Sequence, residues 1–117
     1  MDNNKVTLIE EKDEIDKIIE AKIRNKKIIF TDWYNMGLLR KGIPEERFNE
    51  VFPKFEKVKK IEKENLKSGD IGYELFYELS NNTTVSIGTI PKEKVLLIIH
   101  LIEYKRNLES RFKKFKK

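Results

Sequence analysis

Four side chains on predicted strands of this chain could carry out acid–base chemistry. His100 is the one histidine in the 117 residues, and it lies within the apolar run VLLIIHLI. Strand alternation could bring it onto one sheet face with Glu74, Glu78 and Ser86. A histidine or glutamate as general base, with a cation for the phosphate, would suffice for attack by an RNA 2′-hydroxyl without a metal. These four residues are therefore our candidate catalytic residues. The alternative for His100 is a packed, neutral side chain with one hydrogen-bond partner.

A second candidate site is the cluster of cations at the end of the chain. Residues 105–117 carry a local charge of +6, whereas the other 104 residues sum to −1. The apolar residues Tyr104, Leu108, Phe112 and Phe115 have helical spacing, which predicts a basic C-terminal helix. Its cations could follow a phosphate backbone, form a solvated helix face, or lie on a membrane surface. Our candidate nucleic-acid-binding residues are Lys105, Arg106, Arg111, Lys113, Lys114, Lys116 and Lys117.

Three strands predicted between residues 71 and 104 must position the catalytic candidates. Asn81-Asn82 favours a hairpin turn after the first strand, and Pro91 ends the second. The third strand lacks alternation, which indicates a central strand buried on both faces. The apolar parity predicted to lie under the helices consists of Ile71, Tyr73, Leu75, Tyr77, Leu79, Val95, Leu97, Ile99 and Leu101. The four catalytic candidates lie on the opposite face of the sheet, which carries both polar and apolar residues, if Val85 and Ile87 point toward the core.

The remaining segments are predicted to cover this sheet. Helices are expected over about residues 7–25, 31–41 and 44–52, with short strands over 26–30 and 57–64, while residues 1–4 should be frayed. The first helix could begin with the capping box Thr7-x-x-Glu10 or at Asp13. Thr31 or Asp32 could cap the second helix, and Gly42 should close it. Residues 54–70 could also be helical, and we favour a strand because its charges suit a sheet edge.

Size and composition limit the class of protein. The chain is long enough for one domain over residues 1–117, with an α+β fold, an antiparallel sheet of about four strands and helices on one face. Zero cysteines exclude disulfides, thiol catalysis and cysteine-ligated metals, and one histidine leaves only carboxylate-rich metal sites. We predict no metal and no cofactor. The longest apolar run is far below the ~20 residues that span a bilayer, so we expect a cytoplasmic protein without a membrane partner.

The segment FTDWYNMGLLRKGIPEERFNEVF, which begins at Phe30, resembles domain-of-unknown-function family 4258. That family reads roughly His-Ala-x-x-Arg-hydrophobic-x-x-Arg-Gly-Ile, followed by a short acidic helix. Here the hydrophobic position falls on Leu38, the second basic position on Lys41 and the Gly-Ile pair on Gly42 and Ile43. Trp33-Tyr34 replaces His-Ala, and Gly37 replaces the first arginine. The order of elements is also similar to the RelE and BrnT small toxins, which implies ribonuclease action on messenger RNA, often at the ribosome.

Two function classes follow from these observations. The first is an RNA-binding, RelE-like domain that is either a metal-independent ribonuclease toxin or its inactive descendant, with RNA at the ribosome and an antitoxin-like protein as implied partners. Trp33 and Tyr34 could stack on bases there, although aromatic residues in a small domain are more often in the core. The second is a non-enzymatic module whose mixed sheet face binds a protein partner or a second copy. The apolar residues of that face would be Phe76, Leu96, Ile98 and Ile102.

Overall fold

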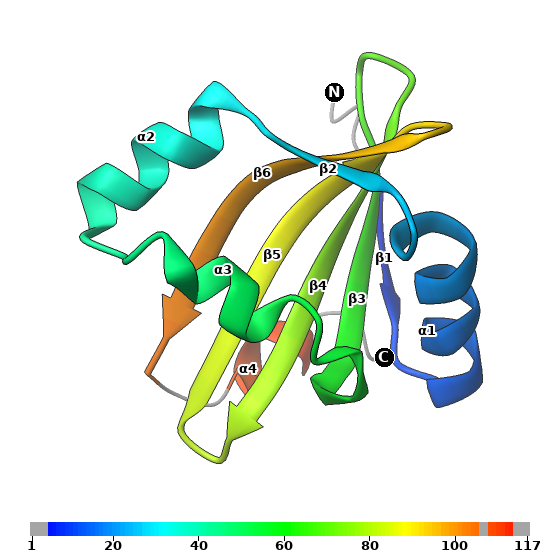
Figure 1. Cartoon of the computed structure of the whole chain (residues 1–117). Coiled ribbons are helices and arrows are strands. Elements are labelled where there is room, and N and C mark those ends of the chain that lie inside the picture. Colours follow the sequence, from blue (N-terminus) through cyan, green and yellow to red (C-terminus); the bar gives the residue numbers. More distant parts are fainter. Residues whose placement is uncertain (1–4, 106–107, 114–117) are drawn as a thin grey trace.

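A six-stranded sheet in the order β1-β3-β4-β5-β6-β2 forms the centre of the molecule (Figure 1). The computed structural model describes residues 5–105 and 108–113. Neighbouring strands are antiparallel except β2 and β6, which are parallel. The strands are β1 (Val6–Ile9), β2 (Lys27–Phe30), β3 (Val58–Asn65), β4 (Ile71–Ser80), β5 (Thr83–Pro91) and β6 (Val95–Tyr104). The predicted α+β class is confirmed, but the sheet is mixed and larger than the four antiparallel strands expected.

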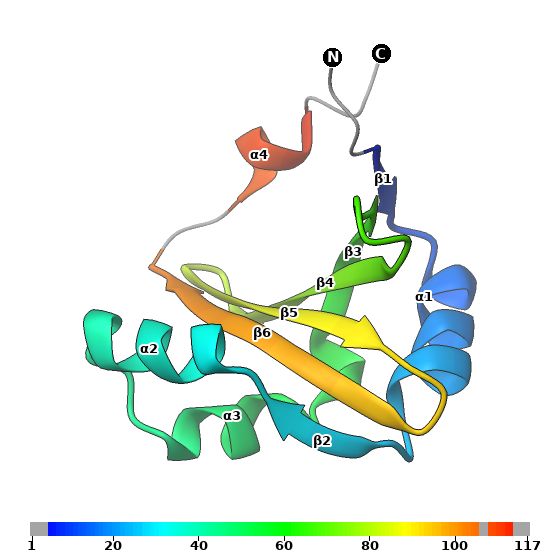
Figure 2. The ribbon, with the colours of Figure 1, turned by 90° about the horizontal axis from the view of Figure 1, so that it is seen from above.

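Helices lie on both faces of this sheet. α1 (Lys12–Ile18) continues as a π-helical turn (Ile19–Ile23), and α2 (Asp32–Lys41), α3 (Glu46–Val51) and α4 (Glu109–Lys113) follow, with a 3-10 turn (Phe55–Lys57) after α3. Figure 2 shows α4 on the side of the sheet opposite α2 and α3. The expectation of helices on one face is therefore wrong for α4. The predicted C-terminal helix starts later than expected, because Tyr104 ends β6. Phe115 lies outside the described residues.

Local signals explain why α2 begins and ends where predicted. The Thr31 hydroxyl accepts the Tyr34 N–H at 3.1 Å and donates to the Ile98 carbonyl at 2.8 Å, so one side chain caps α2 and ties it to β6. Gly42 ends the helix with φ of 67°, a left-handed conformation that glycine adopts at little cost. These contacts fix α2 beside β6, where β2 ends.

The start of the chain differs from the prediction. Val6–Ile9 forms β1, in which Thr7 pairs with Lys63 of β3, so the predicted capping box at Thr7 is wrong. The helix begins at Lys12 and its π-helical turn ends at Ile23, close to the expected end at about residue 25. Residues 1–4, predicted to be frayed, lie outside the described part of the chain. The uncertain segment does contain the favoured strand, since β3 occupies Val58–Asn65. The expected edge position is wrong, because β1 pairs with the outer side of β3.

The core lies between the sheet and the helices α1, α2 and α3. Its sheet side includes Tyr73, Leu75 and Tyr77 of β4 together with Val85 and Ile87 of β5, all buried as the parity predicted. The Tyr77 hydroxyl donates to the Phe52 carbonyl at 2.8 Å, which satisfies this buried polar group. Two central strands therefore present the expected face to the helices.

The parity predicted for β6 is right for His100 and Leu101 but wrong for Val95, Leu97 and Ile99, because this strand contains a β-bulge. Gly88 pairs with His100 but the next residue, Thr89, pairs with Ile98, so Ile99 is the extra residue. Before the bulge the core side chains are Leu96 and Ile98, and after it Leu101. The four apolar residues predicted to form a partner-binding face therefore do not lie together on one exposed face. Leu96 and Ile98 lie in the main core, and Phe76 is covered by Leu108 and Phe112 of the α4 region.

Candidate functional site

The β-bulge turns His100 onto the sheet face opposite the main core. Glu74, Gly88 and His100 occupy one row across β4, β5 and β6. His100 Nε2 lies 2.8 Å from both carboxylate oxygens of Glu74. Without the extra residue Ile99, His100 would share the core face of Ile98 and Leu96. The bulge is therefore the backbone feature that brings the imidazole to the carboxylate.

The Glu74 contact assigns different roles to the two ring nitrogens. A carboxylate accepts hydrogen bonds, so in the neutral imidazole Nε2 is the nitrogen that carries the proton. Nδ1 then carries the ring lone pair that can accept a proton. Glu74 also has a partly exposed side chain, as does His100. The pair is a histidine oriented by a carboxylate, the arrangement that prepares an imidazole for general-base work.

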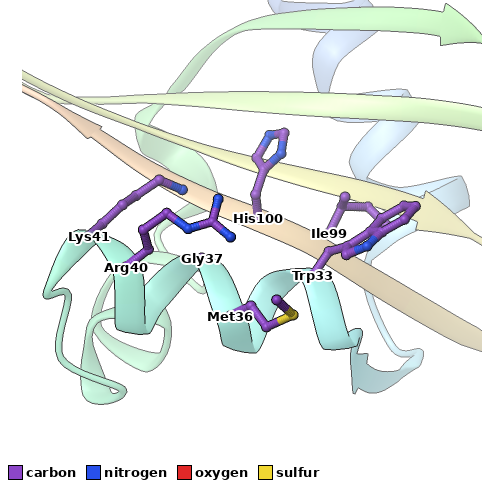
Figure 3. A pocket seen from close by; sticks show the side chains of 7 residues that line it. All are labelled: Trp33, Met36, Gly37, Arg40, Lys41, Ile99 and His100. Carbon is purple, nitrogen blue, oxygen red and sulfur yellow. The ribbon is translucent and has the colours of Figure 1, made fainter.

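His100 also lines a pocket of about 300 Å³ between α2 and β6, near the lower limit of small-ligand sites. The lining residues are Trp33, Met36, Gly37, Arg40, Lys41, Ile99 and His100. Figure 3 shows Trp33 and Ile99 at one end, the cationic Arg40 and Lys41 at the other, and His100 rising from β6 between them. The pocket thus combines an aromatic surface, two cations and an imidazole.

Trp33 and Tyr34 have opposite environments, although both were expected to favour the core. Tyr34 is 3% exposed and stacks on Phe30 with ring centroids 4.7 Å apart. Burial, with a smaller contribution from Glu45, raises the pKa of Tyr34 to about 12. Trp33 is 74% exposed. Tyr34 anchors α2 while Trp33 is free to contact a ligand, so the core expectation is wrong for Trp33.

The structure separates the other two catalytic candidates from His100. Glu78 is exposed and pairs with Thr84. It lies four residues along β4 from Glu74, which is the partner of Gly88. Ser86 is fully buried between Phe76 and Ile102, in the row next to His100. Within the described residues its hydroxyl has no hydrogen-bond partner. Of the four candidates, only Glu74 and His100 are in contact.

The basic C-terminal residues do not form one free surface in the described part of the chain. Arg111 makes two hydrogen bonds to the buried Glu62 carboxylate at 3.0 and 2.9 Å, which raises the pKa of the Arg111 guanidinium. Lys105 lies 3.5 Å from Glu103, and Lys113 is exposed. The remaining candidates Arg106, Lys114, Lys116 and Lys117 lie outside the described residues. Arg111 therefore holds α4 on the sheet, while Lys105 and Lys113 stay accessible.

Sequence reasoning missed Arg40, Met36 and Ile99 as site residues. One signal was present, because residues 33, 36, 37 and 40 follow the i, i+3, i+4, i+7 spacing of one helix face. Of these four residues only Trp33 was considered, as a core or base-stacking side chain, whereas all four line the pocket. Ile99 had no such signal, since the bulge that places it at the pocket is set by strand pairing.

Across residues 5–105 and 108–113, no three histidine, cysteine or carboxylate side chains come together in an arrangement that could hold a metal ion. In the same part of the chain, no helix is both long enough and apolar enough to cross a membrane.

Comparison with known proteins leaves the site to be interpreted from its own geometry. No protein-family profile, curated protein or solved structure matches this chain.

Proposed function

We propose that this protein binds RNA in the pocket between α2 and β6 and cleaves it by metal-independent attack of a 2′-hydroxyl. The observation that carries the proposal is the position of His100. Glu74 orients its imidazole, and His100 opens onto a pocket that Arg40, Lys41 and Trp33 also line. These are the groups needed to take a proton, balance phosphate charge and stack on a base.

In this reaction Nδ1 of His100 accepts the proton of the 2′-hydroxyl. The resulting oxygen nucleophile attacks the adjacent phosphorus, and the bond from phosphorus to the 5′-oxygen breaks to leave a cyclic phosphate. The leaving 5′-oxygen takes a proton from the imidazolium or from water. Arg40 and Lys41 compensate the charge that develops on the phosphate oxygens, and Glu74 stabilises the imidazolium.

The resemblance of residues 30–52 to domain-of-unknown-function family 4258 supports this assignment. The positions at which that family has its histidine and its two arginines fall on Trp33, Gly37 and Lys41, and all three line the pocket. His100 reaches the same pocket from β6, so an imidazole is present although α2 lacks one. We extend the proposal to a RelE-like fold and a toxin role, with messenger RNA at the ribosome as substrate and an antitoxin-like partner.

The test uses purified protein with a single-stranded RNA and the DNA of the same sequence. Cleavage should persist in EDTA, be restricted to the RNA, and fall by about 10²–10⁴-fold in His100→Ala. Arg40→Ala should weaken RNA binding and lower its salt dependence by about one ion, whereas Lys59→Ala, which removes an exposed cation of β3, should change neither. Binding without cleavage would identify an inactive descendant. Wild-type protein that neither binds nor cleaves RNA at low salt would refute the proposal.

A second candidate function is a protein interface on α2, and a separate observation favours it. Trp33, Met36 and Leu39 are 74%, 53% and 85% exposed, which is unusual for large apolar side chains on one helix. Leu39 does not line the pocket, so Leu39→Ser separates the two functions. If α2 pairs with a second copy, this substitution should convert a dimer into a monomer in size-exclusion chromatography without changing RNA binding.

A further inference from the structure

We propose that Gly88 is a positioning residue for His100, because its missing side chain leaves the space through which the imidazole reaches Glu74. The three residues lie in one row, with Gly88 on the strand between the histidine and the carboxylate. A Cβ atom at position 88 would lie 2.7 Å from His100 Nε2 and 3.0 Å from two carbons of the ring. A Cβ contact of 2.7 Å is essentially never seen in folded proteins, so an alanine at position 88 requires the imidazole to move.

The backbone of Gly88 does not itself require glycine. Positive φ angles among glycines occur at Gly42 and Gly69, and Gly88 is not one of them. Glycine in a strand interior usually weakens the strand, and it often marks a place where another group approaches closely. Here the approaching group is the end of the His100 side chain, in particular the nitrogen that contacts Glu74.

The clash involves the free end of a side chain, which determines what an alanine would do. His100 can rotate away without moving the sheet, so Gly88→Ala should remove the contact with Glu74 while the protein still folds. The loss of one hydrogen bond should change the unfolding equilibrium constant by only about 2- to 13-fold. Nε2 would then no longer be held as the protonated nitrogen, and Nδ1 would lose its assignment as the base.

Nitrogen-15 NMR of the imidazole tests this directly, because His100 is the one histidine of the chain and its signals need no further assignment. In the neutral imidazole the chemical shifts of the two nitrogens report which of them carries the proton. Wild-type protein should show the Nε2–H tautomer almost alone. Gly88→Ala should show the mixture of an unrestrained imidazole.

Gly72→Ala is the matched control. Gly72 lies in β4, and a Cβ there would meet its nearest neighbours at an ordinary 3.6 Å. This variant should keep the wild-type tautomer. An unchanged tautomer in Gly88→Ala, or the same change in Gly72→Ala, would overturn the proposal.

A double-mutant comparison of stability tests the proposal if Gly88→Ala folds poorly. The alanine should be harmless in a His100→Ala background, where the group it meets is gone, so recovery of folding in the double variant supports the proposal. Failure of the double variant to fold would mean that the strand itself needs glycine, which would overturn the proposal.

Catalytic positioning by Gly88 rests on the proposed RNA cleavage, but the NMR readout does not. A tautomer change in a protein that cleaves no RNA would uphold the positioning and refute the cleavage.

Discussion

Replacing Arg111 by alanine tests how α4 is held on the sheet. The Arg111 guanidinium makes two hydrogen bonds to the buried Glu62 carboxylate and lies over the Phe76 ring, 5.2 Å from its centroid. Removing one partner of a buried ion pair costs about 3–5 kcal/mol because the other charge is left without compensation. The Arg111 side chain is 37% exposed, so water already reaches part of the pair. We therefore expect Arg111→Ala to lower the free energy of unfolding by about 2–3 kcal/mol.

Urea unfolding followed by circular dichroism measures this loss. The midpoint should fall with little change in the slope, since the unfolded chain exposes nearly the same surface. Lys113→Ala, which removes an exposed cation from the same helix, should cost less than about 0.5 kcal/mol. Glu62→Gln in the Arg111→Ala background should recover about half of the loss, because a neutral amide is cheaper to leave buried than a carboxylate. Equal midpoints for Arg111→Ala and Lys113→Ala would show that the pair does not hold α4.

Three further predictions concern α2. Thr31→Ala should cost about 1–2 kcal/mol in urea unfolding because it removes the cap on the Tyr34 N–H and the bond to the Ile98 carbonyl, while Thr31→Ser, which keeps both, should cost much less. Stability should fall as the pH rises from about 10 to about 12, because the raised pKa of Tyr34 keeps its proton in the folded state after the unfolded chain has released its own. Tyr34→Phe should lack this fall in stability in urea titrations across the same pH range. Gly42→Ala should lower the free energy of unfolding by about 1–2 kcal/mol in thermal unfolding, because Gly42 has a φ of 67°. Gly37→Ala, inside α2, should be neutral or stabilising. A loss of stability at Gly37 equal to that at Gly42 would contradict the reasoning.

Elements with local signals were predictable from the sequence. The ends of α2 follow from Thr31 and Gly42, and the strands β4 and β5 follow from alternation and a hairpin turn. β1 was missed because Thr7-x-x-Glu10 has the pattern of a capping box, whereas pairing with β3 decides its structure. The parallel contact of β2 with β6 has no local signal at all, so a mixed sheet could not be anticipated.

The site was predictable only in part, for a related reason. Alternation suggested that His100 and Glu74 could share a face, and they are in contact. The same alternation placed Ile99 under the helices, because a bulge is set by pairing between strands and not by residue type. Arg40 was missed because helical spacing does not tell which face of a helix meets the core.

The parallel pairing of β2 with β6 also has a consequence for the order of folding. β3 to β6 are joined by short turns and can form as successive hairpins, which brings Glu74, Gly88 and His100 together early. Thr31 and Ile98, which tie α2 to β6, are 67 positions apart in the chain, so closing that loop has a larger entropic cost. We expect the imidazole and its carboxylate to meet before Trp33, Arg40 and Lys41 arrive beside them. The contact between His100 and Glu74 would then exist for some time before α2, although it is synthesised earlier, docks beside β6.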